Sequence, residues 1–305
     1  MKMKSEIKTI LVPTDFTDIS KNALKVAAKM AQRHEAKLIV SHTVQSYYVI
    51  GRGGKQVIGS EVVQDSINLA SAKLEKLKNS FQEKYNLTVE TRISSENIVE
   101  TINDLVATDQ LDLVVMGTAG RQKMKQFLLG SNSYNVLLHA NCSVLLIPEK
   151  FKKTSFKKVL FPVRVEQQLD HKADLSVLLA HKNNGAIMLL GVGAVDEMLN
   201  IKQAYVEMKK NLMFKSANYH SEFQLSYDNA ELISKAAIDK KCDIIMLANK
   251  DENSWKSFMA DNFFKKMING SDIPLFIVKS KCKKIKIKNK KEHTIGYDLT
   301  MPIPG

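Results

Sequence analysis

The first half of the chain alternates between two hydrophobic patterns. Continuous apolar runs at 8–14 (KTILVPT) and 36–44 (AKLIVSHTV) are typical of strands buried on both faces of a parallel sheet. Residues 19–34 place Ala, Leu, Val and Met at helical spacing, and Asp18 is the expected N-cap. The same patterns predict a helix over 61–84, a strand over 87–93, a helix over 96–108, a strand over 112–116, a helix from 131 and a strand over 143–148. This alternation predicts right-handed βαβ units and a parallel sheet.

The second half repeats this order. Its apolar runs at 157–163, 185–192, 242–249 and 273–279 match those at the corresponding places of the first half, and from Leu111 onward the halves align without a gap at an offset of 131 residues. We therefore expect an α/β protein with two tandem, doubly wound, five-stranded parallel sheets of the Rossmann-like type. The expected domains are residues 1–149 and 155–280, followed by a basic tail over 281–305.

Composition narrows the class of protein. The 305 residues are 44% hydrophobic and 25% charged, which is typical of soluble globular domains. No apolar run follows the N-terminal MKMKSEIK, and no stretch is long enough to span a bilayer, so we expect neither a signal peptide nor a membrane protein. Cys142, Cys242 and Cys282 lie far apart, which favours structural thiols in a reducing cytoplasm.

The net charge of +13 raises the question of nucleic acid. Eight lysines lie in 279–305 and five more in 150–158, so the excess is concentrated in a tail and a linker. No aromatic residues alternate with the tail lysines for base stacking. We therefore favour solvated charge over a nucleic-acid site.

A glycine-rich segment separates the predicted strand LDLVVM from the predicted helix YNVLLHA. It begins with Gly117 and Gly120 and ends with Gly130 and Ser131 at the start of the helix. Such a loop lets backbone N–H groups approach an anion, and the glycines put no Cβ in the way. If the first and fourth strands are neighbours, Asp15 faces this loop. Its carboxylate suits a ribose hydroxyl or, through water, a metal ion.

These residues resemble the ATP-binding universal stress proteins. The spacing Gly117-x2-Gly120-x9-Gly130-Ser131 fits the G-x2-G-x9-G-[ST] signature of that family, and ILVPTDFT at 10–17 is similar to its first strand. The resemblance covers residues 5–148 and, more weakly, 155–279. It implies ATP as ligand, with Mg²⁺ or Mn²⁺ as the candidate metal. The implied contacts are Asp15 to ribose, Pro13 and Thr43 beside adenine, Met116 and Gly117 along the nucleotide, and Gly120, Gly130, Ser131, Asn132 and Ser133 around the phosphates. Thr43 and Asn132 depart from the small apolar residue usual in the family.

The second half has lost this signature. The positions of Gly117, Gly120, Gly130 and Ser131 carry Ala248, Asp251, Asp261 and Asn262, and Arg164 replaces Asp15. Carboxylates near a triphosphate repel it, so we expect this half not to bind ATP in the usual pose. Trp255 and Phe258 are expected to cover the vacated site.

The last strand of each half is apolar on both faces. Edge strands of this kind expose unpaired backbone groups. In the resembled family, single-domain members dimerise through this edge. We therefore expect Ser143–Ile147 to run antiparallel to Ile273–Val278 in an intramolecular pseudo-dimer, leaving a monomer or a homodimer formed through another surface.

Three functions remain open. The favoured one is a cytoplasmic stress-response protein, not an enzyme, that binds ATP as a sensor or structural ligand. A slow ATP hydrolase of the adenine nucleotide alpha hydrolase type would need an SGGxDS-like loop after the first strand, which PTDFTDIS does not supply. A ligand-free interaction scaffold is the third. The GRGGKQ segment at 51–56 lacks the ending of a P-loop, and we expect a mobile loop there.

Overall fold

The computed structural model describes residues 5–44, 47–51, 54–58, 60–94, 97–119, 131–164, 169–215, 217–248 and 262–279. The first half contains β1 (Thr9–Pro13), α1 (Asp18–His34), β2 (Lys37–Thr43), β3 (Tyr47–Gly51), β4 (Gly54–Ile58), α2 (Ser60–Tyr85), β5 (Val89–Ser94), α3 (Ile98–Thr108), β6 (Leu113–Thr118), α4 (Ser131–His139) and β7 (Ser143–Pro148). The second half contains β8 (Lys158–Val163), α5 (Leu169–Lys182), β9 (Ala186–Gly193), α6 (Met198–Phe214), β10 (Tyr219–Leu225), α7 (Asn229–Asp239), β11 (Ile244–Ala248), α9 (Asn262–Gly270) and β12 (Leu275–Val278). The strands and helices predicted from periodicity are confirmed, within a few residues at their ends.

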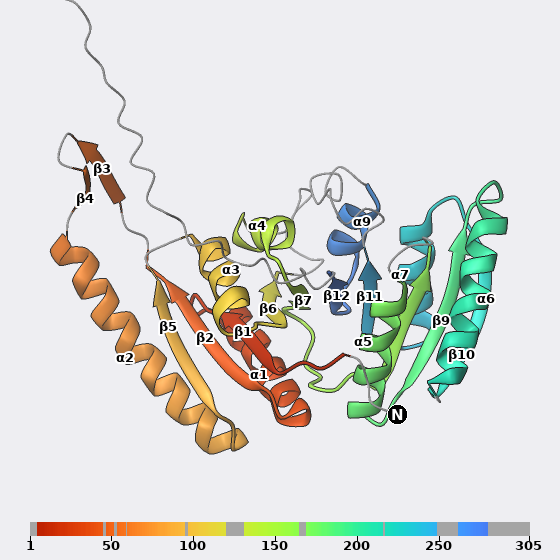
Figure 1. Ribbon diagram of the computed structural model, residues 1–305, viewed down its shortest axis with the longest axis horizontal. Coiled ribbons are helices and arrows are strands. Elements are labelled where there is room, and N and C mark those ends of the chain that lie inside the picture. Colours follow the sequence, from red (N-terminus) through yellow and green to blue (C-terminus); the bar gives the residue numbers. More distant parts are fainter. Residues whose placement is uncertain are drawn as a thin grey trace, which may run out of the picture.

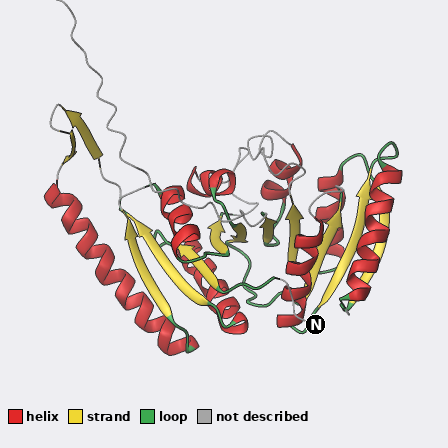
Figure 2. Ribbon diagram, viewed as in Figure 1, coloured by secondary structure: helices red, strands yellow, loops and turns green. Residues whose placement is uncertain are grey.

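One ten-stranded sheet runs through the molecule (Figures 1 and 2), in the order β10-β9-β8-β11-β12-β7-β6-β1-β2-β5. Read from each edge toward the junction of β12 and β7, the two halves have the same strand order. Within each half the pairs are parallel. The α/β fold with parallel sheets is therefore confirmed.

The helices cover both faces of the sheet. The buried side chains of α1, α2, α5 and α6 form one hydrophobic cluster with one face, and those of α3, α4, α7 and α9 form a second cluster with the other. The strands in the middle of the sheet are covered on both faces and so consist of apolar residues without alternation, as β7 (SVLLIP) does.

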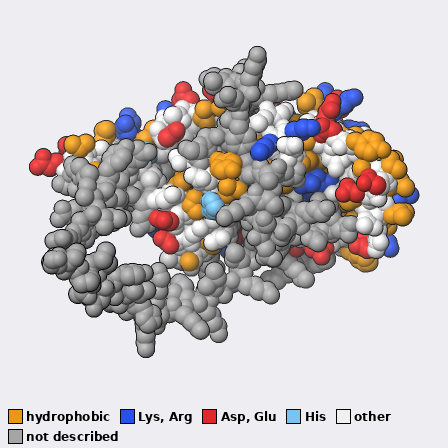
Figure 3. Space-filling model, turned by 90° about the horizontal axis from the view of Figure 1, so that it is seen from above, with side chains coloured by type: hydrophobic (Ala, Val, Ile, Leu, Met, Phe, Trp, Pro, Cys, Tyr) orange, Lys and Arg blue, Asp and Glu red, His pale blue; other side chains and the backbone are white. Residues whose placement is uncertain are grey.

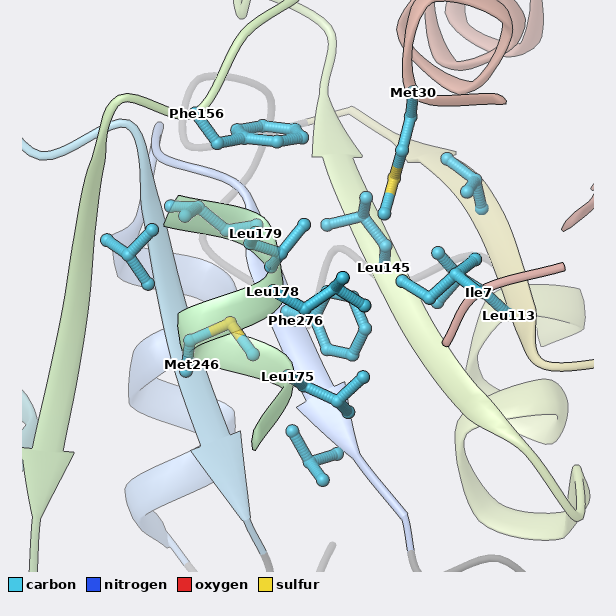
Figure 4. Packing of buried hydrophobic residues seen from close by; sticks show 14 of the residues in the cluster. Ile7, Met30, Leu113, Leu145, Phe156, Leu175, Leu178, Leu179, Met246 and Phe276 are labelled. Carbon is cyan, nitrogen blue, oxygen red and sulfur yellow. The ribbon is translucent and has the colours of Figure 1, made fainter. Parts of the chain in front are cut away.

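At the junction of the two halves, β7 and β12 pair antiparallel, as predicted for Ser143–Ile147 and Ile273–Val278. Leu145 is opposite Phe276, with Leu146 and Val144 opposite Leu275 and Ile277. Figure 4 shows Leu145 and Phe276 among the side chains that pack across this junction. Leu145 is fully buried, so the apolar residues that would have formed an exposed edge in each half are removed from water here.

Two local predictions are wrong. The segment around GRGGKQ, expected to be a loop, is in part an antiparallel hairpin in which β3 pairs with β4 from Tyr47↔Ile58 to Gly51↔Gly54. Aromatic and β-branched residues that flank a glycine-rich segment favour a hairpin, whether or not the segment has the ending of a P-loop. The N-cap of α1 is Thr17 and not Asp18, because the Thr17 side chain accepts the hydrogen bond from the Ser20 N–H. Asp18 occupies the first turn of the helix instead.

Candidate functional site

A cavity of about 430 Å³ lies at the carboxyl ends of β1, β2 and β6. β1 pairs with β2 on one side and with β6 on the other, so the first and fourth strands of the parallel sheet are neighbours, which is the condition under which Asp15 faces the glycine-rich loop. The strand order reverses here, which is where open parallel sheets bind ligands. The first residues of α1, α3 and α4 complete the wall. The lining residues are Pro13, Thr14, Asp15, Thr17, Ile19, Ser20, Ser41, His42, Thr43, Ile98, Met116, Gly117, Thr118, Ala119, Asn132 and Ser133.

The loop between β1 and α1 is fixed by its own hydroxyl groups. The Thr14 N–H continues the sheet ladder by donating to the Ser41 carbonyl at 2.8 Å. The Thr14 Oγ1 accepts from the Phe16 N–H and lies 3.0 Å from the Ser20 Oγ. Phe16 has a φ of 65°, a left-handed conformation that costs a residue with a Cβ roughly 1–2 kcal/mol. These bonds hold the loop in place despite that cost.

Asp15 is the acidic group of this wall. Its Oδ1 accepts from the Thr17 hydroxyl at 2.6 Å and from the Thr17 N–H at 3.1 Å. Partial burial opposes ionisation, but hydrogen bonds from Thr17 and Ser20 prevail and hold the pKa of Asp15 below its usual value. Asp15 is thus an ionised carboxylate at neutral pH. It can accept from a hydroxyl or a metal-bound water, and it repels a phosphate.

Gly117 needs to be glycine for a different reason than the sequence suggests. A Cβ at this position would lie 2.7 Å from the carbonyl oxygen of Ile19 and 2.6 Å from its Cγ2. The absent side chain therefore lets β6 pack against the first turn of α1. The expected reason, close approach of a ligand, is at most secondary, because the neighbouring helix already excludes a Cβ.

On the opposite wall, α4 begins at Ser131, and Asn132 and Ser133 line the cavity. The first N–H groups of a helix have no partner within the helix, and its N-terminus carries a partial positive charge. Of the remaining predicted phosphate contacts, Gly120 and Gly130 lie outside the described residues, as does the side chain of Ser131.

The structure thus brings seven predicted residues to one cavity, namely Pro13, Asp15, Thr43, Met116, Gly117, Asn132 and Ser133. Sequence reasoning missed its hydroxyl groups from Thr14, Thr17, Ser20 and Ser41, and it missed His42. The Nδ1–H of His42 donates to the Thr14 carbonyl at 2.7 Å. The sequence does contain a signal for His42, because it directly precedes the predicted site residue Thr43 at the end of a strand that pairs with β1.

The corresponding place in the second half is filled by side chains of the chain itself. The Arg164 guanidinium carbon lies 3.7 Å from the centre of the Phe263 ring, in the first turn of α9. The buried Lys172 Nζ donates to the Pro162 carbonyl and lies 4.3 Å from the centre of the Phe161 ring. Burial first, and the nearby Arg164 second, hold the pKa of Lys172 well below its usual value. The predicted like-charge residues Asp251 and Asp261, and the predicted covers Trp255 and Phe258, lie outside the described residues.

In the described part of the chain, the side chains outside this cavity do not form a second candidate metal site. Within those ranges, no group of three or more His, Cys, Asp or Glu side chains is arranged to hold a metal ion. None of the described helices is both long and apolar enough to cross a bilayer. Figure 3 shows the described Lys and Arg side chains of the upper face lying among Asp, Glu and hydrophobic ones.

Comparison with known proteins assigns the family. The model of the universal stress protein family matches residues 6–148. Residues 6–148 therefore form a domain of the universal stress protein family. A universal stress protein of Methanocaldococcus jannaschii is 28% identical over 149 residues, which are 48% of this chain and 85% of that protein. One from Thermus aquaticus is 28% identical over 141 residues, 46% of this chain and 98% of that protein.

Two solved structures resemble the chain well beyond the matched segment. The structure of a universal stress protein from Archaeoglobus fulgidus covers 90% of this chain and 97% of its own, with a TM-score of 0.69 and 17% identity. A Pseudomonas aeruginosa protein covers 90% of this chain and 93% of its own, with a TM-score of 0.61 and 16% identity. At these identities the likeness shows the fold, and it extends that fold over both halves of the sheet.

Proposed function

We propose that the cavity between β1, β2, β6 and α4 binds ATP as a sensor or structural ligand, without turnover. The observation that carries this proposal is that an ionised Asp15 and the start of α4 line one cavity of about 430 Å³. Asp15 precedes α1, and α1 and α4 cover opposite faces of the sheet. That volume lies within the roughly 300–1,000 Å³ of small-molecule sites. A ligand that suits both walls has hydroxyl groups at one end and negative charge at the other, as a nucleotide does.

The ribose end fits the wall formed by β1 and β2. An ionised carboxylate has about four acceptor sites, so the two bonds from Thr17 leave Asp15 with capacity for a ribose hydroxyl. Backbone groups of Pro13 and Thr43, at the ends of neighbouring strands, would face the adenine. Asp15 would remain distant from the phosphates, which it repels.

The phosphate end fits the wall formed by β6 and α4. The N–H groups of the first turn of α4, which have no partner within the helix, and the side chains of Asn132 and Ser133 offer donors there. Hydrogen bonds to a charged oxygen contribute roughly 1.5–3 kcal/mol each, more than the roughly 0.3–1 kcal/mol of the helix dipole. Gly120, Gly130 and Ser131 would complete the contacts. A Mg²⁺ or Mn²⁺ ion would be held mainly by the phosphate oxygens.

The placement of the titratable side chains in the described cavity supports binding without hydrolysis. His42 is the one histidine among the described lining residues, and it belongs to β2, two strands away from β6. Two strand spacings are roughly 10 Å, so His42 lies on the β2 side of the cavity, away from the β6 side where the phosphates would bind. Asp15 is on the ribose side.

We further propose that residues 1–149 and 155–280 are two domains related as a pseudo-dimer, with 281–305 as a basic tail. The equal strand order of the two halves and the antiparallel pairing of β7 with β12 support this description. In the second domain the stack of Arg164 on Phe263 takes the place of a ligand. The chain would work in the cytoplasm, with an adenine nucleotide as its partner.

Isothermal titration calorimetry with ATP tests the proposal, and the expected result is one site per chain. Gly130→Asp should abolish binding by placing a charged side chain at the phosphates, whereas the matched change Arg164→Asp in the second half should leave it unaltered. No binding, two equivalent sites or equal binding by both variants would contradict the assignment. Steady hydrolysis at ~1 s⁻¹, an ordinary enzyme rate, would contradict the absence of turnover.

A further inference from the structure

Phe16 has an unusual backbone for a bulky residue. Its φ of 65° lies in the left-handed region, which residues with a Cβ seldom adopt. Among the described residues, the other non-glycine residues with positive φ come just after the ends of helices, where this conformation is a common way to end a helix. They are Glu35, Asn86, Gln110, Asn184 and Lys241. Phe16 instead lies between β1 and α1, in the loop that forms one wall of the cavity. Strain of this kind persists only where surrounding contacts impose it.

Contacts of the Phe16 ring add to the hydroxyl bonds that hold this conformation. The centre of the Phe16 ring lies 4.6 Å from that of His42, with the planes tilted by 40°. The Lys73 Nζ of α2 lies 5.4 Å from the centre of the same ring. Phe16 packs against the hydrophobic core and is absent from the cavity lining, although its neighbours Asp15 and Thr17 both belong to it. The ring therefore anchors the loop on the side away from the ligand.

His42 holds the same loop at a second point. Its Nδ1 lies 2.7 Å from the Thr14 carbonyl oxygen, and a carbonyl can only accept, so Nδ1 carries the proton of this bond. One side chain thus contacts the Phe16 ring and binds the Thr14 backbone. The segment from Thr14 to Phe16 is fixed to the end of β2 through it.

We infer that Phe16 and His42 are positioning residues that hold residues 14–17 in the conformation required for ligand binding. This inference rests on the proposed nucleotide site and extends it, because affinity would depend on Phe16, a side chain outside the cavity lining. If the ring contact is lost, the left-handed conformation at residue 16 is held only by the hydroxyl bonds within the loop. The loop then populates other conformations, and the apparent Kd for nucleotide rises by the inverse of the fraction that remains competent.

The test compares ATP affinity with stability across a small set of variants of the full chain. Phe16→Ala should raise the Kd for ATP about tenfold, as expected if about one molecule in ten keeps a competent loop. Phe16→Tyr retains the ring and should bind like wild type. The control Phe223→Ala removes an aromatic residue that packs 5.4 Å from Tyr205 in the second half. It should lower stability in urea unfolding without changing the Kd.

Substituting Phe16 and His42 together distinguishes a positioning role from a purely structural one. His42→Ala should weaken binding, and the double variant Phe16→Ala/His42→Ala should bind no more weakly than the poorer single variant, because one loop is released in each case. Additive losses would overturn the inference. If Phe16→Ala does not fold, Phe16→Leu supplies the same comparison with the apolar volume retained.

The outcomes separate the two proposals. A wild-type chain that binds no ATP overturns the proposed function and this inference together. A wild-type chain that binds ATP, with Phe16→Ala binding as tightly as Phe223→Ala, overturns the inference alone.

Discussion

Replacing Gly117 by alanine tests whether the contact between β6 and α1 shapes the cavity. The added Cβ would lie 2.7 Å from the Ile19 carbonyl oxygen, well short of an ordinary van der Waals distance, and 2.6 Å from Ile19 Cγ2. The Cγ2 can rotate away, but the carbonyl belongs to the first turn of α1 and cannot. The end of β6 and the start of α1 must then separate by several tenths of an ångström. Overpacking of this kind costs about 1–3 kcal/mol.

Both displaced segments line the cavity, so we expect Gly117→Ala to lose stability and ATP affinity together. The matched control is Gly270→Ala at the end of α9, where an added Cβ meets no atom within 4 Å. Urea unfolding should show the loss for Gly117→Ala and no more than about 0.5 kcal/mol of change for the control. The double variant Gly117→Ala/Ile19→Ala removes the Cγ2 contact and leaves the carbonyl contact, so it should stay destabilised. Recovery in the double variant, or equal stability of Gly117→Ala and the control, would refute the reasoning.

Three further predictions concern stability. Leu145→Lys places a charge opposite Phe276 in the buried junction and should lower the free energy of unfolding by roughly 3 kcal/mol or more. A dye that binds exposed apolar surface should bind the variant, and an unchanged urea midpoint would contradict the prediction. Burial, with Lys182 and Arg33 nearby, lowers the pKa of His34 to about 4. Between pH 6.5 and 4 the unfolded chain therefore binds more protons than the folded one, so the free energy of unfolding should fall by up to about 3 kcal/mol as the pH drops through that range. His34→Leu should flatten this fall, and an identical pH dependence in both proteins would count against it. The pKa of Lys172 is also lowered, so at pH values below the usual lysine pKa its burial lowers the free energy of unfolding, and this loss shrinks as the pH rises toward that pKa. Lys172→Met should therefore be more stable than wild type at pH 7. A loss of stability there would show that the hydrogen bond to Pro162 outweighs the burial cost.

Periodicity and spacing predicted much of this protein because they report on local physics. A strand buried on both faces must be apolar throughout, and a helix on a sheet must be apolar on one side, so the runs at 8–14 and 143–148 and the pattern at 19–34 predict their elements directly. The repeat of these runs predicted that the two halves share one fold, and the sheet has the same strand order in both. The order then brought Pro13, Asp15, Thr43, Met116, Gly117, Asn132 and Ser133 to one edge, because parallel strands place their carboxyl ends together.

Other features depend on neighbours that are distant in the sequence. Gly117 is a glycine because Ile19 packs against it, and no pattern near residue 117 contains that information. His42 enters the site because β2 pairs with β1, which places its ring against Phe16 and its Nδ1 on the Thr14 carbonyl. The sequence by itself determined which segments are strands, helices and donor-rich loops, since those preferences act between residues a few positions apart. Only the tertiary structure decided which side chains share the cavity and which glycine is required by packing, because those contacts exist only after the strands have paired.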